Sequence, residues 1–95
     1  MSQYSREDVE KAINLLFQNQ IDFISEMLDV YGQKSHEKER ERVHLAILKL
    51  SKGDKNQLIY YRDIAKSDYR DVLYWAEYNN DKPIKNPYAE LLKTK

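Results

Sequence analysis

The stretch RVHLAILKL, from Arg42 to Leu50, carries apolar residues on two sides of the helix that it would form. At about 100° of rotation per residue, one ridge contains Val43, Ile47 and Leu50, and a second, nearly opposite, contains Leu45 and Leu48. A helix that is apolar on two sides is usually covered on two sides. The sequence therefore predicts that Val43 to Leu50 is the central helix of the domain, within a helical segment from near Ser35 to Lys52.

The chain before this segment predicts another long helix. Ser5 followed by Glu7 and Asp8 is typical of a helix N-terminus, because Ser caps backbone N–H groups and acids favour the positive end of the helix dipole. Apolar residues then recur at helical spacing: Val9, Ala12, Ile13, Leu16, Phe17, Ile24, Met27 and Tyr31. Gln20 falls within this stripe, so two interpretations stay open. We expect one helix to Tyr31, and a bend near Asn19 to Asp22 is the alternative.

Two more helices are expected after Gly53. Asp54 with Gln57 at the third position after it is a capping pattern, and Leu58, Tyr61 and Ala65 share one face of the helix that follows. A short turn at Lys66 to Asp68 then separates this helix from one that reaches Asn79.

The C-terminal segment contains both prolines of the chain. Pro87 behind Asn86 is placed as the first residue of a helix, which predicts a short helix from Tyr88 to Lys93. Long alternating β-branched runs are absent, so strands are not expected. The predicted fold is all-α, a compact bundle of four main helices plus a short C-terminal helix, in a single domain of residues 1–95.

Composition limits the functional classes. The 16 Lys and Arg residues balance the 16 Asp and Glu residues, so no net field attracts nucleic acid or anionic lipid. The absence of Cys excludes disulfides and Cys-based zinc sites. No run of about 18 apolar residues predicts a membrane span, and MSQYSRED lacks a signal-peptide core. A cytoplasmic protein is the expectation.

Charge is unevenly distributed along the chain. Met1 to Tyr31 has two basic and six acidic residues, whereas Gly32 to Gly53 has six basic and three acidic ones. This predicts that an acidic first segment packs against a basic second segment. The run HEKERER, His36 to Arg42, is interpreted as a solvated first turn or two, with an electrostatic docking strip as the alternative.

The stretch SDYRDVLYWAEYN, Ser67 to Asn79, has two differently used sides. Tyr69, Val72, Leu73 and Ala76 form a core stripe with Trp75 on its flank, while Tyr74 and Tyr78 lie on the other side with Arg70 and Asp71. Packing within this helix does not require these two tyrosines, and Tyr and Arg are enriched at interface hot spots. We therefore predict a partner-binding patch of Arg70, Asp71, Tyr74 and Tyr78. Two alternatives stay open. Another segment, with Ile84 or Tyr88, covers Tyr74 and Tyr78, or these two tyrosines have a base-stacking or cofactor role.

Other chemistry has weaker sequence signals. The helix pair from Asn56 to Asn79 allows a helix-turn-helix interpretation, but Asp68, Asp71 and Glu77 would meet phosphates, and only Arg70 offsets them. Glu41 and His44 have the Glu-x-x-His spacing of di-iron bundles without a second such pair, so no metal site is predicted. His44 is better explained as a border residue with one hydrogen-bonded nitrogen. No nucleophile arrangement or glycine-rich phosphate loop is present, so neither an enzyme nor a cofactor is expected.

RVHLAILKLSKGD (Arg42 to Asp54) and DYRDVLYWAEY (Asp68 to Tyr78) together resemble small bacterial all-helical proteins with no assigned function. The resemblance covers Arg42 to Tyr78 and depends chiefly on Leu48, Gly53, Asp54, Tyr69, Arg70, Asp71, Val72, Leu73 and Ala76. It implies an all-helical cytoplasmic bacterial protein and supplies no catalytic or ligand residues. The sequence favours a small non-catalytic interaction or adaptor protein that binds a protein partner or itself, with a helix-turn-helix DNA-binding regulator as the alternative.

Overall fold

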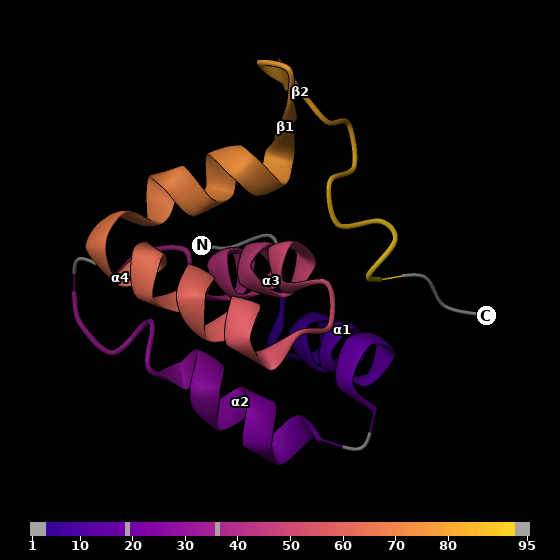
Figure 1. The fold of residues 1–95 in the computed structure, drawn as a ribbon, viewed down its shortest axis with the longest axis vertical. Helices are drawn as coiled ribbons and strands as arrows, with labels where there is room; N and C mark the ends of the chain where they lie inside the picture. Colours follow the sequence, from indigo (N-terminus) through magenta and orange to yellow (C-terminus); the bar gives the residue numbers. More distant parts are fainter. Residues whose placement is uncertain (1–3, 19, 36, 93–95) are drawn as a thin grey trace.

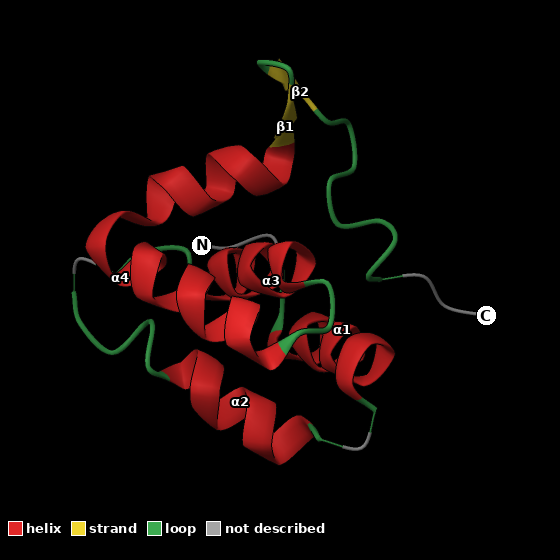
Figure 2. Cartoon of the chain, viewed as in Figure 1, coloured by secondary structure: helices red, strands yellow, loops and turns green. Residues whose placement is uncertain are grey.

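A computed structural model of the chain describes residues 4–18, 20–35 and 37–92. The described residues form four helices and one short pair of strands (Figures 1 and 2). In chain order these are α1 (Arg6–Phe17), α2 (Ile21–Asp29), α3 (Arg40–Ser51), α4 (Lys55–Glu77), β1 (Tyr78–Asn79) and β2 (Lys82–Pro83). The mostly helical, compact fold is as predicted, and its radius of gyration is 12.2 Å.

The central helix is α3. Its six consecutive residues from Val43 to Leu48 have no solvent-exposed surface. The helix packs most extensively against α4 and next against α1, and it lies between them in Figure 1. The prediction that two apolar ridges are covered from two sides is therefore confirmed.

The expected single helix from Ser5 to Tyr31 is wrong. The chain breaks between Phe17 and Ile21, close to the alternative bend at Asn19 to Asp22, and Asn19 itself lies outside the described residues. α1 ends at Phe17 and α2 begins at Ile21, and the residue after α1, Gln18, has non-helical dihedral angles (φ 18°, ψ 127°). Phe17 and the buried face of α2 lie in the same hydrophobic core on either side of this break. The N-terminal prediction is confirmed, because Asp8 N donates to Ser5 Oγ at 3.2 Å.

The acidic first segment contacts the basic second segment at Asp29, at the end of α2. Arg40 Nη2 of the second segment lies 2.8 Å from Asp29 Oδ1, and Arg6 Nη1 of the first segment lies 3.0 Å from the same oxygen. Burial raises the pKa of Asp29, but hydrogen bonds from the two guanidinium groups lower it below its usual value. These pairs are partly exposed and stabilise the fold only modestly.

The two helices expected between Asp54 and Asn79 are present as two parts of α4, separated by a sharp kink. Asp54 caps α4 as predicted, because its Oδ1 accepts from Asn56 N at 2.8 Å. Asp68 has extended dihedral angles (φ −156°, ψ 100°) in place of the predicted three-residue turn. The kink divides α4 into a first arm (55–67) and a second arm (69–77), which fold back beside α3 in Figure 1.

A two-stranded hairpin follows α4, although strands were not expected. Tyr78 pairs with Pro83 and Asn79 with Lys82. The turn residues Asn80 and Asp81 both have left-handed dihedral angles, with φ of 52° and 64°. Asn and Asp tolerate this conformation better than other non-glycine residues, and two such residues give the tight turn that favours hairpins.

The predicted short helix from Tyr88 to Lys93 is not found in its described part. Residues 87–92 form turns, with Leu91 N and Leu92 N donating to Tyr88 O at 3.1 and 3.2 Å. Lys93 lies outside the described residues. Tyr88 and Leu91 are buried, so side-chain packing holds this segment on the core without a regular helix.

None of the helices in residues 4–18, 20–35 and 37–92 is both long and apolar enough to cross a membrane.

Candidate functional site

The predicted patch residues Arg70, Asp71, Tyr74 and Tyr78 lie together along the second arm of α4 and the start of β1, and we call this set the α4 patch. Tyr74 and Tyr78 are 43% and 41% exposed. Their rings are stacked, with centroids 4.9 Å apart and planes 23° from parallel. Tyr74 Oη donates to Asp81 Oδ1 in the hairpin turn. The hairpin thus restrains Tyr74 through this hydrogen bond and Tyr78 through its place in β1.

The C-terminal segment does not bury these rings. Tyr88 is buried at another place, where its ring meets Tyr4 edge-on at 5.4 Å. Trp75, expected at the core edge, is 47% exposed and lies 6.2 Å from the ring of Tyr61 on the first arm. The second arm and the first residue of β1 therefore expose three large rings, those of Tyr74, Trp75 and Tyr78.

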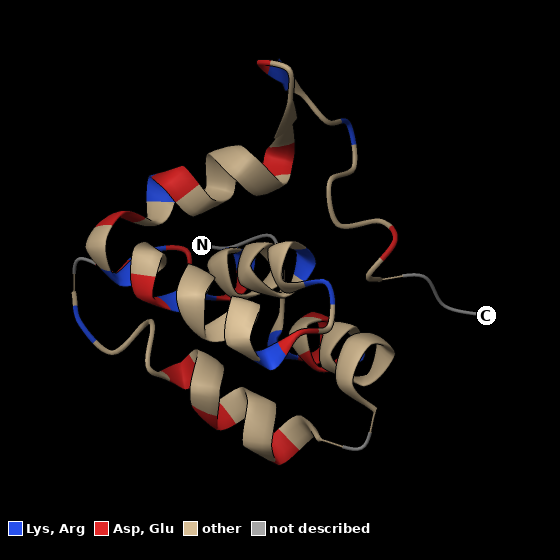
Figure 3. Ribbon diagram, in the orientation of Figure 1, with Lys and Arg blue, Asp and Glu red and all other residues tan. Residues whose placement is uncertain are grey.

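Arg70 is held at the kink of α4. Its Nε and Nη2 donate to the two carboxylate oxygens of Asp68 at 3.0 and 3.1 Å. The same carboxylate accepts from Arg70 N at 3.0 Å, so Asp68 caps the second arm. Its pKa is lowered by the Arg70 side chain and backbone. Figure 3 shows a basic band at the start of the second arm, with acidic bands before and after it.

A hollow of about 300 Å³ lies on one side of the α4 patch. Its residues are Arg42, Arg70, Leu73, Tyr74, Glu77 and Tyr78. Arg42 Nε and Nη2 donate to Glu77 at 2.8 and 2.5 Å, and Tyr88 Oη donates to Glu77 Oε2 at 2.6 Å. Burial raises the pKa of Glu77, but these two donors lower it below its usual value. Glu77 therefore joins α3, α4 and the C-terminal segment.

A second hollow of about 330 Å³ lies on the other side of the patch and has the opposite charge. It is lined by Tyr60, Asp63, Ile64, Ser67, Asp68 and Asp71. Its lining includes three carboxylates and no cationic side chain.

Glu37 has a structural role that the sequence analysis missed, because the charge run around it was interpreted as solvated. Its side chain is 2% exposed. Its Oε1 accepts from Gly32 N and Gln33 N at 2.8 and 3.0 Å, and Lys66 Nζ lies 3.2 Å from Oε2. Burial raises its pKa, but the backbone donors and Lys66 lower it to about 2. The available signal was Gly32, whose left-handed turn (φ 108°) exposes successive N–H groups to a nearby carboxylate.

His44 is fully buried, not a border residue. Its Nε2 lies 3.1 Å from Tyr31 O, and Nδ1 has no hydrogen-bond partner among the described residues. Burial lowers its pKa to about 4. Nowhere in the described ranges do three or more His, Cys, Asp or Glu side chains group in a way that would hold a metal ion.

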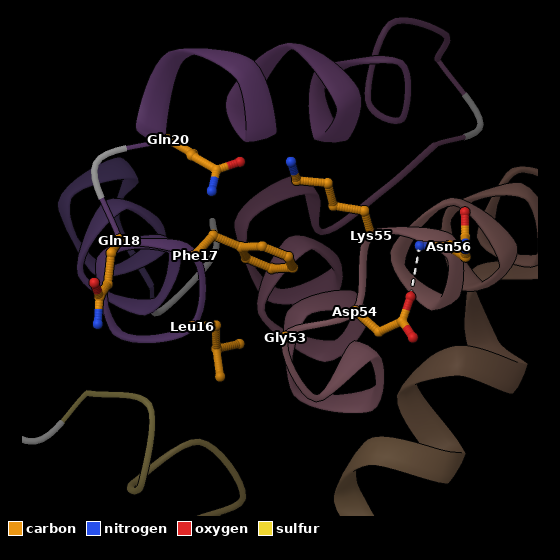
Figure 4. Close-up of a pocket in the computed structure, with 8 residues that line it drawn as sticks. All are labelled: Leu16, Phe17, Gln18, Gln20, Gly53, Asp54, Lys55 and Asn56. Carbon is orange, nitrogen blue, oxygen red and sulfur yellow. Dashed lines mark hydrogen bonds between the residues drawn. The ribbon is translucent and has the colours of Figure 1, made fainter.

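A further hollow of about 560 Å³ lies where the end of α1 meets the start of α4 (Figure 4). Gln18, Gln20 and Lys55 contribute polar side chains to it. Its carboxylate, Asp54, is occupied in capping α4. Lys55 Nζ lies 5.0 Å from the centre of the Phe23 ring. We assign no chemistry to this hollow.

A comparison of the chain with models of known families, with curated proteins and with solved structures finds no match. The resemblance to small bacterial proteins stays a prediction.

Proposed function

We propose that this chain is a small, non-catalytic, cytoplasmic bacterial interaction or adaptor protein that binds a protein partner through the α4 patch. The observation that carries the proposal is the stacked pair Tyr74 and Tyr78, exposed by 43% and 41%. Large rings with a polar tip, beside an exposed guanidinium, are the side chains that most often dominate protein interfaces.

Contacts within the chain already restrict the side chains of the α4 patch before a partner binds. Stacking and the hydrogen bond to Asp81 restrict Tyr74, and the fork to Asp68 restricts Arg70. Immobilising a flexible side chain on binding costs about 0.5–1.5 kcal/mol. Side chains that are already fixed reduce this cost, which favours a binding role.

The helix-turn-helix alternative has less support. The guanidinium of Arg70 is shared with Asp68, and Asp71 lies beside it, so a phosphate would meet carboxylates at the exposed side of the second arm.

The proposal is tested by replacing Tyr78 with the photoreactive analogue p-benzoylphenylalanine and irradiating cells that express the chain. The analogue keeps an aromatic ring at position 78 and leaves the charges of the patch unchanged. We expect a covalent adduct with a protein, either another molecule of this chain or a different one. Leu15 on α1, 57% exposed, is the matched control position. Adducts at both positions to the same extent, or at neither, would overturn the proposal.

A further inference from the structure

We propose that the partner at the α4 patch is a second copy of this chain, an inference that rests on the proposed function. The two copies pack along the second arms of α4, about a two-fold axis parallel to these arms. The charges on the two sides of the patch, the position of the tyrosines between them and the zero net charge of the chain support this partner.

The patch separates two hollows of opposite charge. The hollow on one side contains the cations Arg42 and Arg70 with one carboxylate, that of Glu77. The hollow on the other side contains only carboxylates as charged groups, those of Asp63, Asp68 and Asp71. Most of these charges are paired within the chain: Arg42 with Glu77 and Glu39, Asp63 with Arg62, and Asp68 with Arg70. Attraction between two identical patches therefore depends on Arg70 and Asp71.

Arg70 and Asp71 are the charged groups of these hollows that retain capacity for a new contact. Arg42 is bound to Glu77, and Asp63 is 2.9 Å from Arg62. Arg70 donates to Asp68 through Nε and Nη2, which leaves further N–H groups of the guanidinium. Asp71 takes part in none of the ion pairs between the residues that the structure describes.

Helical geometry fixes the direction of packing. At about 100° per residue, Tyr74 lies between Arg70 and Asp71 around the second arm. A two-fold axis parallel to the arms brings Arg70 of each copy opposite Asp71 of the other, as opposite edges meet in a parallel coiled coil. An axis perpendicular to the arms would instead place Arg70 beside Arg70 and Asp71 beside Asp71. The charges therefore favour the parallel arrangement, with Tyr74 at its centre.

The size of the surface predicts a weak dimer. A standard interface buries about 800 Å² per partner from about 20–30 residues, against a total accessible surface of 6274 Å² for this chain. The two hollows together are lined by only twelve residues, six in each. The formal net charge of zero means that two copies do not repel each other at long range. We expect reversible association with a micromolar dissociation constant.

Sedimentation velocity from micromolar to millimolar protein tests this inference with two charge variants. Arg70→Glu places a carboxylate at both edge positions of the patch, 70 and 71, and Asp71→Arg places a guanidinium at both. Each variant alone is expected to stay monomeric at concentrations where the unchanged chain dimerises. An equimolar mixture is expected to form a heterodimer at least as tight as the original dimer, because both cross-interface pairs are then opposite in charge. Added salt is expected to weaken that heterodimer.

Controls separate loss of binding from loss of folding. Lys11→Glu changes an exposed cation on α1 in the same way and is expected to dimerise like the unchanged chain. Circular dichroism and thermal melting establish that each variant is folded, and recovery in the mixture does so independently.

A chain that stays monomeric at millimolar concentration, or a variant mixture that associates no better than its components, would overturn the second copy as partner. In that case a photoadduct at position 78 with a different protein would leave the proposed function standing. A dimer that persists in the Tyr74→Ala, Tyr78→Ala double variant and in both charge variants would overturn the inference and also place self-association outside the patch.

Discussion

Lys66 binds Glu37 across the fold, with its Nζ 3.2 Å from Glu37 Oε2 and 3.0 Å from Val30 O. The ammonium group of Lys66, on the first arm of α4, therefore binds two residues of the segment that joins α2 to α3. The carboxylate also accepts from the backbone of the turn at Gly32. This contact links parts of the chain that are 29 residues apart, so it constrains the tertiary fold and not one helix alone.

Glu37→Gln is expected to destabilise the protein. The amide retains one acceptor oxygen, but the charge that strengthens four hydrogen bonds is lost, and at least one of the four donors loses its acceptor. Losses of this kind cost about 1–3 kcal/mol. Urea unfolding followed by circular dichroism measures the change, and Glu26→Gln on the exposed side of α2 is the matched control, expected to be neutral. Equal midpoints for the two variants would contradict a structural role for Glu37.

Acid is expected to unfold the protein progressively as pH falls from about 4.5 towards 2, the range set by the usual and folded pKa values of Glu37. Its folded pKa is depressed, so the unfolded state binds the proton more tightly. The stabilisation is complete above the unfolded pKa and is lost as pH falls through the folded one. Asp29 and Glu77 shift in the same direction and add to the effect. Urea midpoints across this range should fall less steeply for Glu37→Gln than for the unchanged chain.

His44 is expected to stay neutral well into the acid range. Burial lowers its pKa to about 4, the positive charge of Arg40 acts in the same direction, and the contact with Tyr31 O opposes them. The free imidazole titrates near 6.5, so stability falls as pH drops from that value towards 4. The chemical shift of its Cε1 proton, followed by NMR, should show no inflection near 6.5. An inflection there would mean that the ring is accessible to solvent.

Tyr88→Phe is expected to loosen the C-terminal segment. The variant keeps the buried ring but removes the hydrogen bond to Glu77 Oε2, which costs about 0.5–1.5 kcal/mol, or more because the acceptor is charged. Hydrogen exchange of the Ile84 amide, which donates to Glu77 O at 2.8 Å, reports whether the segment opens. Tyr60→Phe removes an exposed hydroxyl on the same chain and should change neither stability nor exchange.

The sequence predicted the features that depend on local pattern. The central position of α3 followed from apolar ridges on two sides, and the Ser5 and Asp54 caps followed from residue type alone. The break after Phe17 did not follow from the pattern, because a polar residue within an apolar stripe permits either a helix with an imperfect face or two helices. The outcome depends on how much core each arrangement buries, which periodicity alone cannot rank.

Features that depend on distant partners were missed or wrongly expected. Glu37 was interpreted as solvated because its neighbours are charged, whereas its cationic partner is Lys66. The segment after Pro87 was expected to be helical from its capping pattern, but burial of Tyr88 and Leu91 decides its path. The members of the α4 patch were found from helical spacing, yet the hydrogen bond from Tyr74 to Asp81 depends on a hairpin that was not expected.

Asp68 is the non-helical residue at the bend of α4, and its carboxylate also binds the guanidinium of Arg70. Replacement of Asp68 by a residue without a carboxylate would remove the cap of the second arm and release the guanidinium in the same step. Evolution acting on this residue therefore cannot adjust the shape of the molecule independently of the surface that it offers to others. A related protein without the bend in α4 would therefore be expected to lack the α4 patch, or to bind its partner through a different surface.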